Sequence, residues 1–247
     1  MSGHDKASER CRVTIRFSKA DTIQPEYDIM VSRELITKHS EYFRAAFEHD
    51  CFVEAQTGIV VLDDSDRMPC THFVEWIYLE AGFRNMGKPD GNGQNAPEHS
   101  HPSHSARSTS IPPHQIKQIL LYCLIFAEIR QAPGFHNSAM AKLIYGFESK
   151  TLPLLSRSEI EHVYNNTIKG SLIRKIVVDI FVSKLHGDNG QKYQRLLTEG
   201  DRYHQPYDAT FLEDVLLASL NSTQAKLHPS AWNKGAYMVK VGNVRRA

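Results

Sequence analysis

The chain has 247 residues, which is enough for one sizeable domain with tails or for two small domains. Its 29 basic and 28 acidic side chains give a formal net charge of +1, so no strong field favours nucleic acid, membranes or acidic substrates. Hydrophobic residues make up 41% of the sequence, which suffices for a substantial core. No apolar run approaches the roughly 18 residues that span a bilayer.

The first ten residues are polar and lack the apolar segment of a secretory signal. We therefore expect an intracellular protein, in the cytoplasm, the nucleus or both. We expect no binding to membranes or nucleic acid, because the basic residues form no dense cluster.

The N-terminal third carries the alternating patterns of a small β-sheet. Residues 12–17 alternate polar and apolar side chains, which places the apolar ones on one strand face. The same period returns at 27–31 after a turn, so the two segments predict a hairpin. The β-branched run at 58–62 is too short for a helix and predicts a third, buried strand.

Helical signals lie between these strands and after them. Ser32 and Ser40 can cap short helices at 33–38 and 41–49, because each hydroxyl accepts a hydrogen bond from a free backbone N–H. Residues 67–80 place aromatic and aliphatic side chains at helical spacing, which predicts a longer helix with one buried face.

The composition then changes over residues 85–113, which are built mainly from Gly, Asn, Pro, Ser and His. Ordering a residue costs about 1–2 kcal/mol, and this segment has almost no apolar surface to offset that cost. We therefore expect a disordered insertion within a domain. Helical spacing resumes afterwards and predicts helices at 116–127, 135–147 and 172–185. Between the last two, a Ser156-x-x-Glu159 capping box opens a further predicted helix that runs to about residue 165.

These signals predict three regions in the chain. Residues 1–10 form a disordered N-terminus, and residues 11–186 form one folded unit that the insertion at 85–113 interrupts. Residues 187–247 form a weakly basic tail, largely disordered, with a helical pattern at 211–220 that lacks an evident docking partner.

Residues 40–62, which read SEYFRAAFEHDCFVEAQTGIVVL, resemble part of the BTB/POZ domain in the form common among fungal proteins. The later tract Phe73-Val-Glu-Trp-Ile-Tyr78 and the helical segment Leu121-Tyr-Cys-Leu-Ile-Phe-Ala-Glu128 follow in the family order. Residues 161–181 look like the C-terminal extension of fungal members. The resemblance implies an α+β fold, with a small β-sheet packed against a cluster of short helices and a C-terminal helical extension.

BTB/POZ domains bind other proteins and usually catalyse no reaction, so the resemblance implies a non-enzymatic interaction module. Cullin-binding members carry a hydrophobic–any–Glu triplet after the second short helix, and Phe52-Val53-Glu54 occupies that place. This implies a substrate adaptor that joins an unidentified client to a cullin-type ubiquitin ligase. Phe52, Val53 and Glu54 are then the partner-binding residues.

Two alternatives stay open. The chain could be a self- or hetero-associating regulatory scaffold with no link to ubiquitin. Phe52 could also fill the domain's own core while Glu54 faces water. The sequence departs from better-known members at Arg12, where an aspartate is usual, and at Ser32, where a histidine is usual. The first ten residues are too short for the N-terminal helix that family dimers exchange, so the oligomeric state is open.

Other candidate sites give weaker signals, and we expect no catalytic residue, metal site or cofactor. The only close carboxylate cluster precedes a predicted helix, where capping and the helix dipole explain it: Asp63, Asp64 and Asp66. Three histidines fall in the predicted disordered insertion: His99, His101 and His104. Four scattered cysteines form no Cys-x-x-Cys pair: Cys11, Cys51, Cys70 and Cys123.

Overall fold

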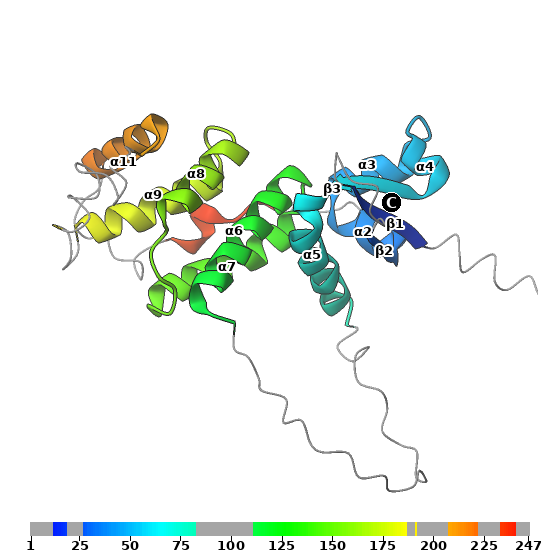
Figure 1. Cartoon of the computed structure of the whole chain (residues 1–247), viewed down its shortest axis with the longest axis horizontal. Helices are drawn as coiled ribbons and strands as arrows, with labels where there is room; N and C mark the ends of the chain where they lie inside the picture. Colours follow the sequence, from blue (N-terminus) through cyan, green and yellow to red (C-terminus); the bar gives the residue numbers. More distant parts are fainter. Residues whose placement is uncertain are drawn as a thin grey trace, which may run out of the picture.

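A computed structural model describes residues 12–18, 27–82, 111–186, 191, 207–221 and 233–240. This part of the chain has a mixed α+β fold, mostly helical, with one three-stranded sheet. The predicted α+β class is therefore confirmed. Figure 1 shows an elongated arrangement, in which the sheet and the first helices lie at one end and the later helices at the other. Within the described ranges, no helix has the length and apolarity needed to cross a bilayer.

The sheet has the strand order β2-β1-β3. The central strand β1 (Arg12–Ser18) pairs antiparallel with β2 (Tyr27–Ser32), which confirms the hairpin, and parallel with β3 (Ile59–Asp63). The predicted third strand is present, but it is buried on one face only, because Val60 and Leu62 are buried whereas Val61 is 54% exposed. Successive side chains of a strand point to opposite faces of the sheet, so only alternate side chains of β3 face the core.

Four helices accompany the sheet, and they are α2 (Arg33–His39), α3 (Glu41–Glu48), α4 (Val53–Thr57) and α5 (Arg67–Glu80). The predicted caps are confirmed, since the hydroxyls of Ser32 and Ser40 accept hydrogen bonds from backbone N–H groups in the first turns of α2 and α3. The short helix α4 was not predicted, because five residues are too few to show a helical period.

Beyond the insertion lie α6 (Pro113–Ile129), α7 (Pro133–Glu148), α8 (Arg157–Asn166) and α9 (Leu172–Leu185). The predicted end of the insertion was wrong at Pro113, which is the first residue of α6. Proline suits this position because its fixed φ fits a helix and its missing N–H would have no partner there. Pro133 starts α7 in the same way. Residues 85–110 of the predicted insertion lie outside the described residues.

An aromatic cluster joins the segments on the two sides of the insertion. The Phe73 ring of α5 lies 6.1 Å from Phe43 of α3, 5.9 Å from Phe126 of α6 and 5.4 Å from Phe135 of α7, between centroids. Phe73 and Phe43 are fully buried. The described segments before and after the insertion therefore share one core.

Arg130 adds a polar connection at the same junction. Its Nη2 donates to Asp66 Oδ2 at 2.6 Å, its guanidinium lies 4.5 Å from the centroid of the Tyr42 ring, and its carbonyl accepts from Ser40 Oγ at 2.5 Å. The backbone N–H of Glu41 also donates to Gln131 O at 3.1 Å. These contacts fix the start of α3 against the turn between α6 and α7.

The helix expected at 211–220 is confirmed as α11 (Ala209–Asn221), whereas the predicted disorder of the tail does not hold for the 3₁₀ turn η4 (Lys234–Tyr237). Phe211 of α11 is fully buried, with its ring 5.5 Å from Tyr164 and 5.3 Å from Phe181. Tyr237 is buried, and its hydroxyl donates to Asp179 Oδ2 at 2.6 Å. The apolar face of the extension buries both segments, so the helix at 211–220 does have a docking surface.

Truncation of Phe73 tests whether the aromatic cluster holds the two segments together. Phe73→Ala should lower the free energy of unfolding by about 3–5 kcal/mol, because it removes a buried ring and leaves a cavity. Chemical denaturation measures this change. Leu79→Ala on the same helix is the control, since Leu79 is 53% exposed and its loss should alter stability by no more than about 0.5 kcal/mol. Equal effects of the two substitutions would contradict the role of the cluster.

Candidate protein-docking site

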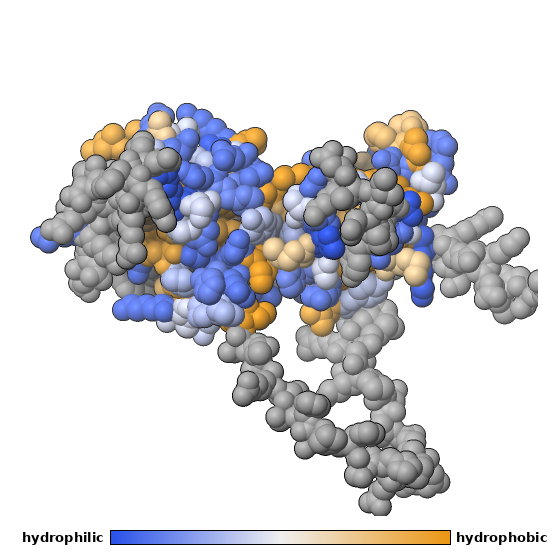
Figure 2. Space-filling view, in the orientation of Figure 1, coloured by the Kyte–Doolittle hydropathy of each residue, from blue (hydrophilic) through white to orange (hydrophobic). Residues whose placement is uncertain are grey.

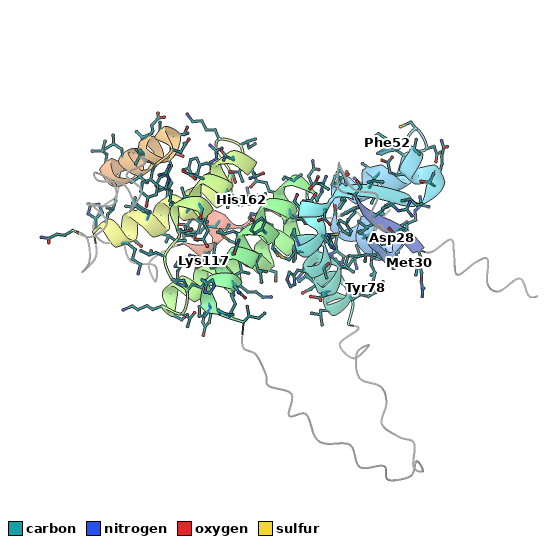
Figure 3. The ribbon with its side chains drawn as sticks, in the orientation of Figure 1. Asp28, Met30, Phe52, Tyr78, Lys117 and His162 are labelled. Carbon is teal, nitrogen blue, oxygen red and sulfur yellow. The ribbon has the colours of Figure 1, made fainter. Side chains whose placement is uncertain are left out.

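The predicted triplet lies on an exposed tip of the molecule, at the start of α4. Phe52 is 46% exposed and Val53 is 67% exposed, whereas Glu54 is half-buried. Figure 3 shows Phe52 at the α4 end of the molecule, and Figure 2 shows hydrophobic surface there. The alternative in which Phe52 fills the core and Glu54 alone faces water is therefore wrong. We call Phe52, Val53 and Glu54 the α4 surface.

The end of α3 places Phe52 in this position. His49 caps the C-terminus of α3, and its ring packs edge-on against the Phe52 ring with 6.2 Å between centroids. The Phe52 N–H donates to His49 O at 3.0 Å, which closes a tight turn. The Phe52 side chain thus gains one aromatic neighbour and still presents a large apolar area to solvent.

Gly58 fixes the other end of α4. It adopts the left-handed conformation with φ 69°, and its N–H donates to Glu54 O at 2.8 Å. The Gly58 carbonyl accepts from the Thr14 N–H of β1, also at 2.8 Å. The helix is therefore connected directly to the sheet, which makes the α4 surface a defined feature rather than a loose loop.

Acidic groups surround the apolar side chains of this surface. Glu48 and Asp50 are exposed in the segment just before Phe52, and Glu54 follows it. The nearest exposed cation in sequence is Arg44, whose guanidinium is bound to the Glu41 carboxylate, and this hydrogen bond raises the pKa of Arg44. The surface thus combines an apolar anchor with negative charge, which suits a partner that presents an apolar pocket and basic groups.

The outer face of the sheet carries two further exposed apolar side chains, which the sequence patterns did not reveal as a site. Met30 is 66% exposed on β2 and Val61 is 54% exposed on β3. Between them runs β1, whose Arg16 forms a two-point ion pair with Asp28 at 3.1 and 3.0 Å. The alternation in β2 does contain the signal for Met30, whereas the uniformly apolar run of β3 hides Val61.

The aspartates before α5 have structural partners. Asp63 accepts from the Ser65 N–H at 2.8 Å, and its hydrogen bonds to Ser65 lower the pKa of its carboxyl. Asp64 pairs with Arg67, and Asp66 with Arg130. The capping interpretation is confirmed for Asp63, at the 3₁₀ turn η1 (Asp64–Asp66), but Asp66 forms no side-chain cap on α5.

Two cysteines are buried in the core rather than in a cleft. Burial raises the pKa of Cys70 and of Cys123 to about 12, so both thiols stay protonated and are poor nucleophiles at neutral pH. Across the described ranges, no group of three or more potential metal ligands comes together. The three histidines of the insertion and Cys11 lie outside the described residues.

No protein-family model, curated protein or solved structure matches this chain.

Substitution of Gly58 tests the anchoring of α4. Gly58→Ala should lower the free energy of unfolding by about 1–2 kcal/mol, because a Cβ is disfavoured at positive φ although no atom lies within 4 Å of it. Gly58→Asn is the matched control and should have a smaller effect, since asparagine tolerates this conformation better. Thermal or urea unfolding measures both. An alanine variant as stable as the original would show that α4 does not end in this geometry.

Proposed function

We propose that this chain is a non-enzymatic protein–protein interaction module of the BTB/POZ type, and that it acts as a substrate adaptor for a cullin-type ubiquitin ligase. The order of its elements supports the family: a hairpin, two short helices, a parallel third strand, a longer helix, a helical pair and a helical extension. The observation that carries the cullin proposal is the exposure of Phe52 and Val53 at the place where cullin-binding members have their triplet.

The α4 surface alone cannot provide enough binding free energy for a stable complex. Full burial of a phenylalanine contributes about 1.5–3 kcal/mol, whereas micromolar binding needs about 8 kcal/mol. A cullin must therefore contact further residues, and the exposed side of α3 is continuous with the α4 surface through His49. Recruitment of a client then falls to another part of the chain. Helix α11, which packs on the helical extension, is suited to this role because it exposes Leu216, Leu217 and Leu220.

Binding of a purified cullin N-terminal domain tests the proposal. Phe52→Ala should weaken the complex by about ten- to a hundredfold, which corresponds to the loss of one buried aromatic anchor. Glu54→Ala should weaken it further, and calorimetric titration measures both. Circular dichroism of each variant checks that the fold is retained.

Met30→Ala is the matched control for this experiment. Met30 is an exposed apolar residue on the sheet, away from Phe52 in Figure 3, so its truncation should leave cullin binding unchanged. A complex of undiminished affinity after both Phe52→Ala and Glu54→Ala would remove the role proposed for the α4 surface.

Exposed apolar side chains on the outer face of the sheet support a second candidate function, which is self-association in a regulatory assembly. Met30 and Val61 present apolar side chains on one face, and β2 and β3 are the outer strands of the described sheet. Exposed sheet faces and unpaired strand edges are common sites of association.

This second candidate predicts a mass that rises with concentration from the 28.1 kDa of one chain toward twice that value. Size-exclusion chromatography with light scattering measures the mass. Val61→Lys should keep the chain monomeric, because a charge on an associating apolar face is unfavourable. A constant mass of one chain across the concentration series would rule out self-association through this face.

A further inference from the structure

A cleft of about 1030 Å³ lies where α2 and α3 face the turn between α6 and α7. Residues of α2 and α3 line one side of the cleft. Residues 131–132 of the turn and 133–134 at the start of α7 line another. Val239 of the C-terminal segment also lines it. None of the three residues of the α4 surface lines the cleft, so the two sites are separate.

His136 lines this cleft although only 1% of its surface is exposed. Neither of its ring nitrogens has a hydrogen-bond partner among the described residues. The adjacent Asn137 amide is occupied by the backbone of Val239, with hydrogen bonds of 2.8 and 2.9 Å. An unpaired buried polar group is costly, so a ligand that bonds to the ring would gain affinity from it.

The protonation state of His136 determines which ligand groups it can bind. Burial lowers the pKa of the His136 ring. The ring is therefore neutral at pH 7, with one nitrogen that donates and one that accepts. A ligand that carries N–H groups can satisfy the accepting nitrogen.

The charged side chains that line the cleft indicate the sign of the charge that such a ligand carries. Four carboxylates line it, from Glu34, Glu41, Glu48 and Glu128, against two permanently charged cations, Lys38 and Arg44. Glu41 and Arg44 already pair with each other. The remaining excess of negative charge attracts a cation and disfavours an anion such as phosphate or an acidic side chain.

We propose that this cleft binds an arginine side chain that a partner protein presents. The planar guanidinium has five N–H donors in a fixed geometry, so it can bond to more than one acceptor at once, which the compact ammonium of lysine does less well. Glu34 and Glu48 attract the charge and His136 accepts one hydrogen bond. This inference does not depend on cullin binding, because none of Phe52, Val53 and Glu54 lines the cleft, although Glu48 and the exposed side of α3 border both sites.

Titration of the full chain with N-acetyl-arginine methylamide tests the proposal. The probe should shift the amide resonances of cleft residues such as Gln131 and Gly134 in a saturable way, with a millimolar dissociation constant. N-acetyl-citrulline methylamide has nearly the same shape without the charge, and it should bind about tenfold more weakly. Equal binding of the two probes, tighter binding of N-acetyl-aspartate methylamide, or no saturable shift would overturn the proposal.

Two sets of variants test whether the arginine probe binds in the cleft. His136→Phe keeps an aromatic ring without nitrogens and should weaken the arginine probe about threefold or more. The double change Glu34→Gln and Glu48→Gln should weaken it about three- to fivefold, and both positions are exposed, so the fold is retained. Glu213→Gln on α11 is the matched control and should have no effect. Unchanged affinity in the double variant would contradict the proposal even if His136→Phe failed to fold.

A shortened chain tests whether the arginine that occupies the cleft comes from a partner protein or from the C-terminal residues of this chain. Arg245 and Arg246 follow the described segment that ends at Lys240. A chain that ends at Lys240 should bind the probe with unchanged affinity if a partner is the natural ligand. An increase of about threefold or more would show that residues 241–247 compete for the cleft, which would overturn the assignment to a partner.

Discussion

Phe73 is surrounded by aromatic rings from α3, α5, α6 and α7, and this packing is the constraint on which the other features of the protein depend. The rings lie on both sides of residues 83–110, which the structure does not describe. Helices far apart in the sequence must therefore meet before the core is complete. Arg130 reinforces the junction because its charge is paired with Asp66 and stacked over Tyr42.

The position of α3 follows from this junction, and the candidate docking site follows from the position of α3. The aromatic cluster holds the buried face of α3, and Ser40 and Glu41 attach its first residues to the α6–α7 turn. Its last turn then projects toward α4, where Gly58 returns the chain to the sheet. In the described part of the chain, Phe52 is left 46% exposed beside the end of α3. Exposed aromatic side chains of this kind are common anchors in protein recognition.

The two candidate sites next to α3 differ in shape and chemistry. Beyond its C-terminus, the α4 surface is convex, apolar and rimmed by carboxylates. Beside it, the cleft is concave and polar, with His136 at a buried position and an excess of negative charge. Both surfaces carry exposed carboxylates. The shared negative character arises although the whole chain has a formal charge of only +1, because local arrangement rather than composition sets the field at a site.

The sequence by itself determined the local features. Period-two alternation predicted the hairpin, Ser32 and Ser40 marked two helix starts, and the Ser156–Glu159 capping box is present as predicted. These signals are reliable because each depends on residues within one or two turns of the same segment. The tertiary structure alone decided which faces are covered. It exposes Phe52 and buries Lys117 beside Glu159, with 2.8 Å between the charged atoms. A periodic pattern tells which side chains share a face, but the coverage of that face depends on segments distant in the sequence.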